Sequence, residues 1–415
     1  MRPVGRTLDM YGPFLPMFGG IFCCLLGVGA SLATVPFYVL RDLHGGNVEV
    51  GVAVAALSVA AVVGRPVAGR FADRHGYKVV MLCGTIICTA AGLAYYGAAN
   101  IGVLVLVRIL NGLGEGTVYT GGAAWLVSLC PADRRGRVVG LYGIFMWLGI
   151  TVGTLVGTVA MRVSGFPAVW GLCAVAGFAG FVSVVSKKAP PRREAALGGR
   201  SAILPMAAVV PGLSVSLAAL GYAALAAFVS LHMLARGVSN GIAAFDAFGF
   251  TYIGVRLFIG NIPDRLGPRP VAFWSAIVEA IGLVIVALAG NLVTVIIGGF
   301  VIGAGLSLLF PALALIVINH SAESQRGAAL GAFTSFWDVG IAVGAPMSGL
   351  IASLGNYTDI YYVMAVCAVA SAVLAKPDLV RRRGSAGGPA AGAAASAEAG
   401  SAVGSADPGG GAPGR

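Results

Sequence analysis

The sequence predicts an all-α membrane protein with twelve transmembrane helices in two six-helix pseudo-repeats. Hydrophobic residues make up 58% of the chain and charged residues only 10%, whereas a soluble domain carries roughly a quarter charged residues. Apolar runs of about twenty residues, long enough to cross ~30 Å of hydrocarbon, recur along most of the chain. Equivalent residues also recur at one fixed offset, which indicates a duplicated unit.

The expected transmembrane helices follow these apolar runs in chain order. The first six are 14–40, 48–68, 79–98, 101–128, 138–161 and 167–186. The second six are 203–235, 241–259, 271–289, 292–318, 328–354 and 360–374. The 63 glycines fit such a bundle, because small residues let helices approach closely inside a membrane.

This assignment divides the chain into four parts. Residues 1–186 form an N-terminal six-helix half and residues 203–375 a C-terminal six-helix half. The basic segment 187–202 is expected to be a cytoplasmic linker between them. Residues 376–415 become rich in Gly, Ala, Ser and Pro, so we expect a disordered cytoplasmic tail.

The duplication is clearest in two short stretches between apolar runs. Asp73 and Asp264 lie 191 positions apart, each followed by an arginine, Arg74 or Arg265. The glycines of these stretches are Gly69, Gly76, Gly260 and Gly267. The same offset pairs Arg65 with Arg256, Gly112 with Gly303, Gly114 with Gly305, Gly140 with Gly331, Gly149 with Gly340 and Gly153 with Gly344. The chain therefore contains two copies of one design joined head to tail.

The distribution of Lys and Arg predicts the orientation. If both termini are inside, the outer loops hold only Arg41, Arg162 and Arg236, and the inner segments hold most other basic residues. The positive-inside rule then predicts a multi-pass protein of the plasma membrane with both termini cytoplasmic. Basic loops at a lipid surface also explain the net charge of +11, so we expect a lipid partner and no nucleic acid.

The two Asp-Arg stretches, the twelve spans, the six-plus-six duplication and the charged linker resemble the signature of the major facilitator superfamily. The resemblance covers residues 10–375. It implies two halves related by an axis along the membrane normal, with a substrate site near the midplane. It also implies that both Asp-Arg stretches latch the inner gate in the outward-open state. Tyr77 replaces a usual basic residue, while Asn261 and Pro268 weaken the second copy, so we expect the first latch to be stronger.

The Asp-Arg stretches also have a direct physical rationale. Their glycines allow tight turns and close backbone approach. Asp73 and Asp264 can accept hydrogen bonds from a neighbouring helix N-terminus, and the two arginines can pair across the inner face. The alternative is that these charges only set the topology of the chain.

Ionisable residues inside the spans are candidates for function, because a charge at membrane depth is costly. Arg108 and Glu115 in the fourth span are seven residues apart, which places them on one helix face about 10 Å apart along the axis. Arg108 resembles an arginine that the family associates with proton coupling, and Glu115 can carry a proton. A static ion pair or a polar contact between helices is the alternative for both.

Further charged residues inside the spans include Asp338, Glu279, Arg65 and Arg256. Asp338 in the eleventh span is near mid-depth, and its repeat mate is Trp147. Asp338 is a candidate for proton or substrate contact, with a structural bond to a helix end as the alternative. Glu279 is expected to have a buried structural partner, because its span is peripheral in the fold that the chain resembles. Arg65 and Arg256 lie near inner span ends and are expected to snorkel or brace the inner gate rather than to bind substrate.

Aromatic residues in the spans expected to border a cavity could form an apolar, adaptable substrate chamber. Its expected members are Tyr38, Tyr119, Trp147, Tyr222 and Trp337, with Phe37, Phe228, Phe310 and Phe336 as further candidates. Packing or interfacial anchoring is the alternative for each residue.

The glycines of the fifth span have the spacing of a motif found in drug exporters. Gly149, Gly153 and Gly157 recur every four residues and resemble the antiporter motif, although Thr154 stands where that motif has proline. Close helix packing explains the same spacing without reference to transport direction.

Several function classes are not expected. The chain has no phosphate loop, since Arg70 and Phe71 follow Gly69 where lysine and a hydroxyl residue are needed, which argues against ATP-driven transport. The four histidines have neither metal-ligand spacing nor a nucleophile–base arrangement. We therefore expect no metal, no cofactor and no enzymatic activity.

The sequence favours a secondary active transporter. The leading hypothesis is proton-coupled export, by antiport and alternating access, of a small hydrophobic drug or secondary metabolite, as in efflux-based antibiotic resistance. We expect the protein to act as a monomer. The alternatives are proton-coupled uptake of a sugar or organic acid and, from another class, a membrane sensor that transports nothing.

Overall fold

The computed structural model describes residues 12–131, 134–187, 205–322 and 325–376. Nearly all of the expected linker 187–202 and tail 376–415 lies outside the described residues. In the first half, the short helices η1 and η2 span Gly12–Phe14 and Tyr95–Gly97. The long helices of that half are α2 (Leu15–Arg41), α3 (Asn47–His75), α4 (Tyr77–Ala94), α5 (Ile101–Leu129) and α6 (Arg135–Val185).

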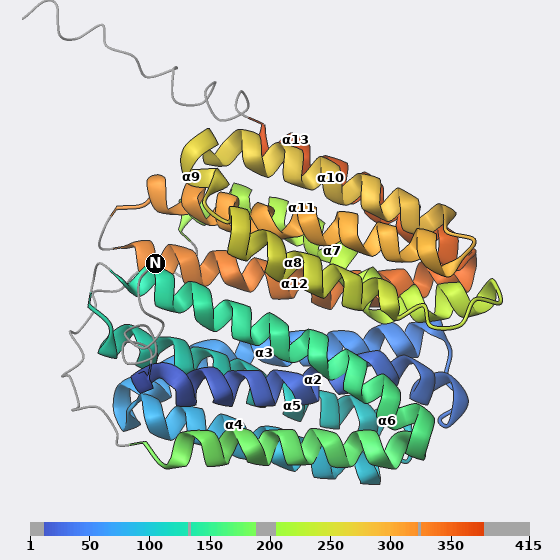
Figure 1. Ribbon diagram of the computed structural model, residues 1–415, viewed down its shortest axis with the longest axis horizontal. Helices are drawn as coiled ribbons and strands as arrows, with labels where there is room; N and C mark the ends of the chain where they lie inside the picture. Colours follow the sequence, from blue (N-terminus) through green and yellow to red (C-terminus); the bar gives the residue numbers. More distant parts are fainter. Residues whose placement is uncertain (1–11, 132–133, 188–204, 323–324, 377–415) are drawn as a thin grey trace, which may run out of the picture. The chain divides into compact units, whose positions relative to one another are not determined.

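The second half repeats this all-helical pattern. Its helices are α7 (Met206–Ala235), α8 (Ala243–Ile259), the short α9 (Ile262–Leu266), α10 (Pro268–Leu288), α11 (Leu292–Asn319), α12 (Arg326–Leu354) and α13 (Tyr357–Ala375). In Figure 1 the first half runs from blue to green and the second from yellow-green to red. The described helices of both halves belong to one packed unit that ends at Ala375.

The described helices provide the twelve predicted crossings. Ten of them are long and apolar enough to span a membrane. One of the ten, α6, is 51 residues long and contains Gly165 at φ 73° and ψ −171°, a non-helical conformation that divides it into the fifth and sixth spans. The eighth span is α8, which is only 17 residues long. The predicted fold class is therefore confirmed.

The 191-residue offset is visible in local backbone structure. Asn100 accepts a hydrogen bond from the backbone of Val103 at the start of α5, and Asn291 does the same for Thr294 at the start of α11. Such side-chain bonds satisfy backbone N–H groups that a helix start leaves unpaired. Because matching helices begin on matching residues, the two copies fold alike at this level.

The same offset recurs in the packing of two glycines. A Cβ added to Gly112 would lie 2.1 Å from the carbonyl oxygen of Leu57, and one added to Gly303 would lie 2.5 Å from that of Phe248. Leu57 and Phe248 are themselves repeat mates. Both halves thus need glycine on α5 or α11 so that the backbone of α3 or α8 can approach closely.

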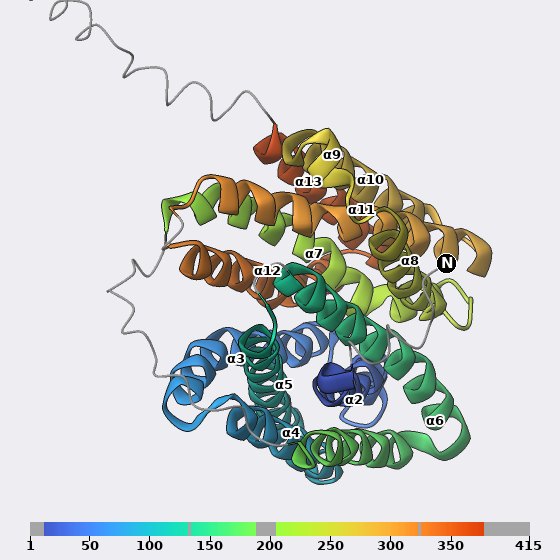
Figure 2. The same cartoon turned by 60° about the vertical axis from the view of Figure 1, so that its left-hand side comes forward.

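The halves join chiefly through α3 with α12 and through α6 with α8. We call the end with residues 69–78 and 260–269 the Asp-Arg end; it lies at the left in Figure 1 and is turned forward in Figure 2. At the opposite end, a Cβ on Gly51 would lie 2.4 Å from the carbonyl oxygen of Ala345. A Cβ on Gly349 would lie 2.3 Å from the carbonyl oxygen of Asn47. The backbones of the two halves are therefore in direct contact at that end.

A second contact between the halves closes the same opposite end. Thr154 of α6 donates a hydrogen bond of 2.5 Å to the buried carboxyl of Asp246 on α8. One turn further along α8, Gly249 leaves no room for a Cβ, which would lie 2.1 Å from Oγ1 of Thr151. Arg162 also donates to Asn240 across the halves. Asp246 was not among the functional residues predicted from the sequence.

Candidate functional site

A cavity of about 480 Å³ lies between the two halves and is bordered by α2, α3, α5, α6, α7, α8, α11 and α12. It extends to the Asp-Arg end, because Pro263 and the exposed residue Asp264 of α9 border it. Its charged or aromatic lining residues include Arg65, Arg108, Glu115, Tyr119, Trp147, Tyr222, Tyr252, Arg256, Phe310, Trp337 and Asp338. Together with the contacts at the opposite end, this places the protein in a conformation open at the Asp-Arg end.

A charge cluster on the cavity wall joins the two halves. Arg65 of α3 forms an ion pair with Asp338 of α12, at 2.7 Å from Nη1 to Oδ2 and 3.3 Å from Nη2 to Oδ1. Glu115 of α5 lies 3.9 Å from Nη2 of the same arginine. All three side chains are largely buried, with 16% of Arg65, 13% of Glu115 and 7% of Asp338 exposed. Two carboxylates from opposite halves therefore share one guanidinium.

Arg65 was expected to snorkel or to brace the inner gate, and the structure gives it a more specific place. Its guanidinium carbon lies 5.0 Å from the ring centre of Tyr119, within the range of a cation–π contact. Because its other contacts are Asp338 and Glu115, Arg65 faces the cavity rather than a lipid surface. Arg65 is the central residue of the cluster. The cluster itself was not predicted from the sequence.

Arg108 and Glu115 border the same cavity, as their spacing predicts, but the structure contains no ion pair between them within its described residues. Arg108 is fully buried. It donates to the carbonyl oxygen of Ala53 at 3.0 Å and to Ser31 Oγ at 3.0 Å. It therefore links α5 to α2 and α3 through neutral oxygens, and its proposed role in coupling stays a prediction.

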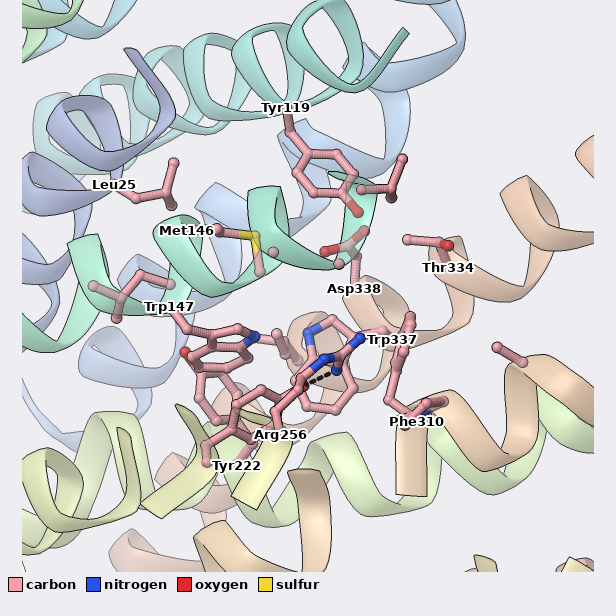
Figure 3. Close-up of a pocket in the computed structure, with 18 of the residues that line it drawn as sticks. Leu25, Tyr119, Met146, Trp147, Tyr222, Arg256, Phe310, Thr334, Trp337 and Asp338 are labelled. Atoms are coloured by element: carbon pink, nitrogen blue, oxygen red, sulfur yellow. Dashed lines mark hydrogen bonds between the residues drawn. The ribbon is translucent and has the colours of Figure 1, made fainter. Parts of the chain in front are cut away.

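Arg256 of α8 is the repeat mate of Arg65 and also borders the cavity. Its Nη1 donates to the hydroxyl of Tyr252 at 3.2 Å, a bond that is drawn as a dashed line in Figure 3. The side chain is half-buried, and the expected snorkelling or bracing of the inner gate stays a prediction.

Four of the five expected chamber aromatics border the cavity: Tyr119, Trp147, Tyr222 and Trp337. Tyr38 does not. Its hydroxyl donates to the carbonyl oxygen of Ala98 at 2.9 Å, and its ring packs edge-on against Trp170 at 5.3 Å. Tyr38 is thus a packing residue of the first half, because the rotation of α2 turns it away from the chamber.

Two further lining residues supplement the expected aromatics. Phe310, one of the additional candidates, borders the cavity, and Tyr252 does so without having been predicted. Tyr252 was recognisable only as an aromatic residue one turn before Arg256 on the same helix.

The Asp-Arg stretches adopt matching backbone turns. Gly76 has φ 91° and Gly267 has φ 89°, a conformation that favours glycine, so the expected turns occur there. Gly69 instead lies inside α3, and no atom of the described residues lies within 4 Å of an added Cβ. Gly260 ends α8 with an ordinary negative φ. The expected tight turn or close approach is therefore not observed at Gly69.

The acidic residues of these stretches are free of the expected helix-end bonds. Asp73 and Asp264 are exposed, and no hydrogen bond or ion pair to either carboxylate occurs among the described residues. Arg265 is exposed too, and Arg74 does have an interaction partner. Because this end is open here, the latch that the resemblance implies would form only in the opposite conformation.

Glu279 of α10 was expected to have a buried structural partner. It is completely buried, yet neither carboxyl oxygen has a hydrogen-bond partner among the described residues. A Cβ on Gly221 of α7 would lie 2.8 Å from Oε1. The carboxyl is therefore packed between helices of the second half, away from the cavity.

The glycines of the fifth span serve close packing in this structure. An added Cβ would lie 2.5 Å from Phe22 O at Gly149, 2.2 Å from Leu26 O at Gly153 and 2.6 Å from Ala30 Cα at Gly157. All three contacts are made to α2. The spacing that resembles an antiporter motif therefore sets how closely α6 lies against α2.

Comparison with known proteins identifies the class of this one. A family model described as Major Facilitator Superfamily matches residues 17–246 and 211–404. An uncharacterized MFS-type transporter of Burkholderia mallei strain SAVP1 is 30% identical over 365 residues, which cover 85% of this chain and 89% of that protein. Another uncharacterized MFS-type transporter, from Salmonella typhimurium, is 28% identical over 366 residues, which cover 85% of this chain and 93% of that protein. The chain belongs to the major facilitator superfamily.

Solved structures support the same fold. A point mutant of the nucleoside transporter NupG superimposes with a TM-score of 0.70 at 15% identity, covering 87% of this chain and 98% of that one. The human organic anion transporter MFSD10 superimposes with a TM-score of 0.66 at 15% identity. The match covers 90% of this chain and 100% of that one. At this identity the likeness concerns the fold alone. The protein is thus a multi-pass membrane transporter of small molecules, not an enzyme.

Proposed function

We propose that this transporter exports a small, largely apolar organic molecule in exchange for protons. Export would take place across the plasma membrane, by alternating access, with both termini cytoplasmic and the protein acting as a monomer. The observation that carries the proposal is the pairing of Arg65 with both Asp338 and Glu115 on the wall of the cavity.

The charge cluster can link protonation to the movement of the halves. Arg65 and Asp338 belong to opposite halves, so their attraction favours the conformation in which α3 and α12 are together. A proton on Asp338 would cancel the charge of the carboxylate and weaken this attraction. Because a ligand that binds one conformation more tightly shifts the equilibrium toward it, a proton bound here would change the balance between conformations.

The position of the cluster also connects protons with substrate. Arg65, Glu115 and Asp338 border the same cavity as the aromatic residues. A molecule bound in that cavity would therefore lie close to the groups that carry the proton. Binding of one partner would change the free energy of binding the other, which is the thermodynamic requirement for coupling.

Two observations support the direction and the class of substrate. The open end carries the basic stretches 69–78 and 260–269, and basic loops face the cytoplasm under the positive-inside rule. The cavity would then be open to the cytoplasm, where an exporter loads. Its volume of about 480 Å³ and its aromatic lining suit a drug-sized apolar molecule.

An accumulation assay in a bacterium that lacks its main efflux pumps tests the proposal. Cells would express the wild type, Asp338→Asn, Glu115→Gln or the control Asp42→Asn, which removes an exposed acid at the end of α2. We expect the wild type and the control to lower the accumulation of at least one fluorescent drug, and a protonophore to abolish the effect. The two cavity variants should restore high accumulation at equal membrane expression.

Two results would argue against export. If expression of the wild type raised the accumulation of a compound, uptake of that compound would replace export as the function. If expression changed the accumulation of no drug in a broad panel, the exporter hypothesis should be dropped.

A further inference from the structure

We infer that the transported molecule is an aromatic organic anion, and that Arg256 binds its anionic group next to a wall of aromatic side chains. The inference rests on the proposed transport function and narrows its substrate class. It follows from a difference between two arginines that the duplication makes equivalent.

Arg65 and Arg256 occupy the same position in the two halves, but their surroundings differ. Arg65 is neutralised by Glu115 and Asp338. The residues at the corresponding positions of the other half are Leu306 and Trp147. The duplication has therefore kept both arginines, but it has kept carboxylate partners for Arg65 alone.

Arg256 consequently brings a positive charge to the cavity without a directly paired carboxylate among the described residues. Its described polar contact is the hydroxyl of Tyr252, at 3.2 Å from Nη1, and no ion pair of Arg256 occurs in the part of the chain that the structure describes. Taking a cation out of water is costly unless an opposite charge or enough hydrogen bonds compensate. An anionic group of a ligand would supply that compensation through charge-assisted hydrogen bonds, which guanidinium forms in pairs with carboxylates and related oxyanions.

Next to Arg256, aromatic rings form a continuous wall. Tyr252 lies with its ring centre 6.0 Å from the guanidinium carbon of Arg256 and 4.4 Å from the ring of Trp147. Trp147 contacts Tyr222 at 5.6 Å, and Tyr222 contacts Trp337 at 5.4 Å. Figure 3 shows Arg256 on the same side of the cavity as Trp147, Tyr222 and Trp337, with Asp338 nearer to Tyr119.

This arrangement matches a flat ring with one negative charge. The ring would stack or pack edge-on against the wall, as aromatic groups do, while the anionic group reaches Arg256. The carboxylates Glu115 and Asp338 repel an anion less than free carboxylates would, because both already face Arg65.

The membrane potential is consistent with export of such a molecule. A potential that is negative inside drives an anion outward and opposes the outward movement of a cation. An exporter of anions would therefore gain from the potential as well as from the proton gradient, whereas export of a cation would have to work against the potential.

A binding experiment with three matched probes tests the inference. The probes are 1-naphthalenesulfonate, neutral 1-naphthalenesulfonamide and cationic 1-naphthylmethylammonium, titrated by calorimetry into the full-length protein in lipid nanodiscs. We expect the wild type to bind the sulfonate at least about tenfold more tightly than the sulfonamide, the gain from a charge-assisted hydrogen bond. The ammonium probe should bind most weakly.

Variants at Arg256 assign the preference to one side chain. Arg256→Gln should weaken binding of the sulfonate by about tenfold and leave the sulfonamide unchanged, which also shows that the cavity is intact. Arg256→Lys should retain part of the preference, because it keeps the charge. Arg326→Gln, which removes an exposed charge at the start of α12 outside the cavity lining, should behave like the wild type.

Four outcomes of these titrations would contradict the role of Arg256. Equal affinity for the three probes, a preference for the ammonium, absence of binding by all three, or a sulfonate preference that survives Arg256→Gln would overturn the inference. Calorimetry without a gradient does not depend on proton coupling. Sulfonate binding through Arg256 in a protein that moves no protons would contradict the proposed function and leave this inference standing.

Discussion

Arg65 and Asp338 form a two-point ion pair that joins α3 of the first half to α12 of the second inside the cavity. The pair lies on the open side of the contacts between halves, and Glu115 reaches the same guanidinium from α5. The ion pair that joins the halves in the described part of the chain is therefore one that a proton can weaken.

Removing one partner of this pair should impair both transport and stability. Asp338→Asn leaves Arg65 without its closer carboxylate, and breaking a buried ion pair from one side costs about 3–5 kcal/mol. Because Arg65 is partly exposed, we expect Asp338→Asn to lose less stability than this. The same variant should also lose proton-coupled transport. The triple variant Arg65→Gln, Glu115→Gln and Asp338→Asn removes all three charges of the cluster and should recover most of the stability but no coupling. Thermal unfolding in detergent and a transport assay measure the two effects; equal stability of all three proteins would contradict the prediction.

Overpacking the contact that closes the end opposite the Asp-Arg end should favour the conformation in which that end is open. Gly349→Val introduces a side chain where even a Cβ would lie 2.3 Å from Asn47 O, and overpacking of this kind costs about 1–3 kcal/mol. The matched control is Gly254→Val in α8, where an added Cβ meets no atom within 4 Å. We expect Gly349→Val to increase labelling of a cysteine placed at Asn47 by an impermeant maleimide, in a background without native cysteines. Unchanged labelling would show that this contact does not hold the end closed.

The bond between Thr154 and Asp246 should contribute to the same closure. Thr154→Val keeps the shape of the side chain but removes the donor to the buried carboxyl, and an unsatisfied buried polar group costs about 1–3 kcal/mol. We expect more labelling at the closed end than in the wild type, as for Gly349→Val. Thr158→Val is the control, since that hydroxyl bonds within its own helix. Equal labelling of Thr154→Val and Thr158→Val would remove Asp246 from the closure.

Trp147 borders the cavity and Tyr38 does not, so substitutions at these two residues should have different effects. Trp147→Ala removes part of the aromatic wall and should weaken substrate binding by about tenfold, or ~1.4 kcal/mol. Tyr38→Phe loses one hydrogen bond to Ala98 and should lower stability by about 1 kcal/mol without changing affinity. Binding titrations and thermal unfolding distinguish the two. A Tyr38→Phe variant with impaired affinity would place Tyr38 back in the chamber.

The two Asp-Arg stretches should contribute unequally to the closed state of their own end. Asp73→Asn is expected to abolish transport while membrane insertion stays normal, because the first stretch keeps more of the latch residues that the family resemblance implies. Asp264→Asn should reduce transport less. Transport rates normalised to membrane-inserted protein provide the comparison, and full transport by Asp73→Asn would exclude the gating role.

The sequence alone predicted the spans and the duplication because both depend on local or periodic properties. Apolar length decides where a helix crosses, and one offset places Asn100 and Asn291 at matching helix starts. The kink at Gly165 was likewise visible as a break between the fifth and sixth apolar runs.

The partners of individual charges could not be predicted in the same way. Whether Glu115 meets Arg108 or Arg65 depends on the rotation of α3 and α5 against each other, and spacing along α5 does not determine that rotation. The pairing of Arg65 with Asp338 depends further on how the halves dock. The contact of Asp246 with Thr154 of the other half also depends on how the halves dock, so the sequence alone does not predict it.

Proton flux in proteoliposomes tests the proposed coupling most directly. Vesicles that contain an internal pH indicator and the purified protein would receive a gradient of a compound whose accumulation the wild type lowers in cells. We predict that the gradient drives protons in the opposite direction in the wild type, and that Glu115→Gln and Asp338→Asn abolish this flux. Transport of the compound without proton movement, or wild-type proton flux in both variants, would contradict the assignment of coupling to Arg65, Glu115 and Asp338.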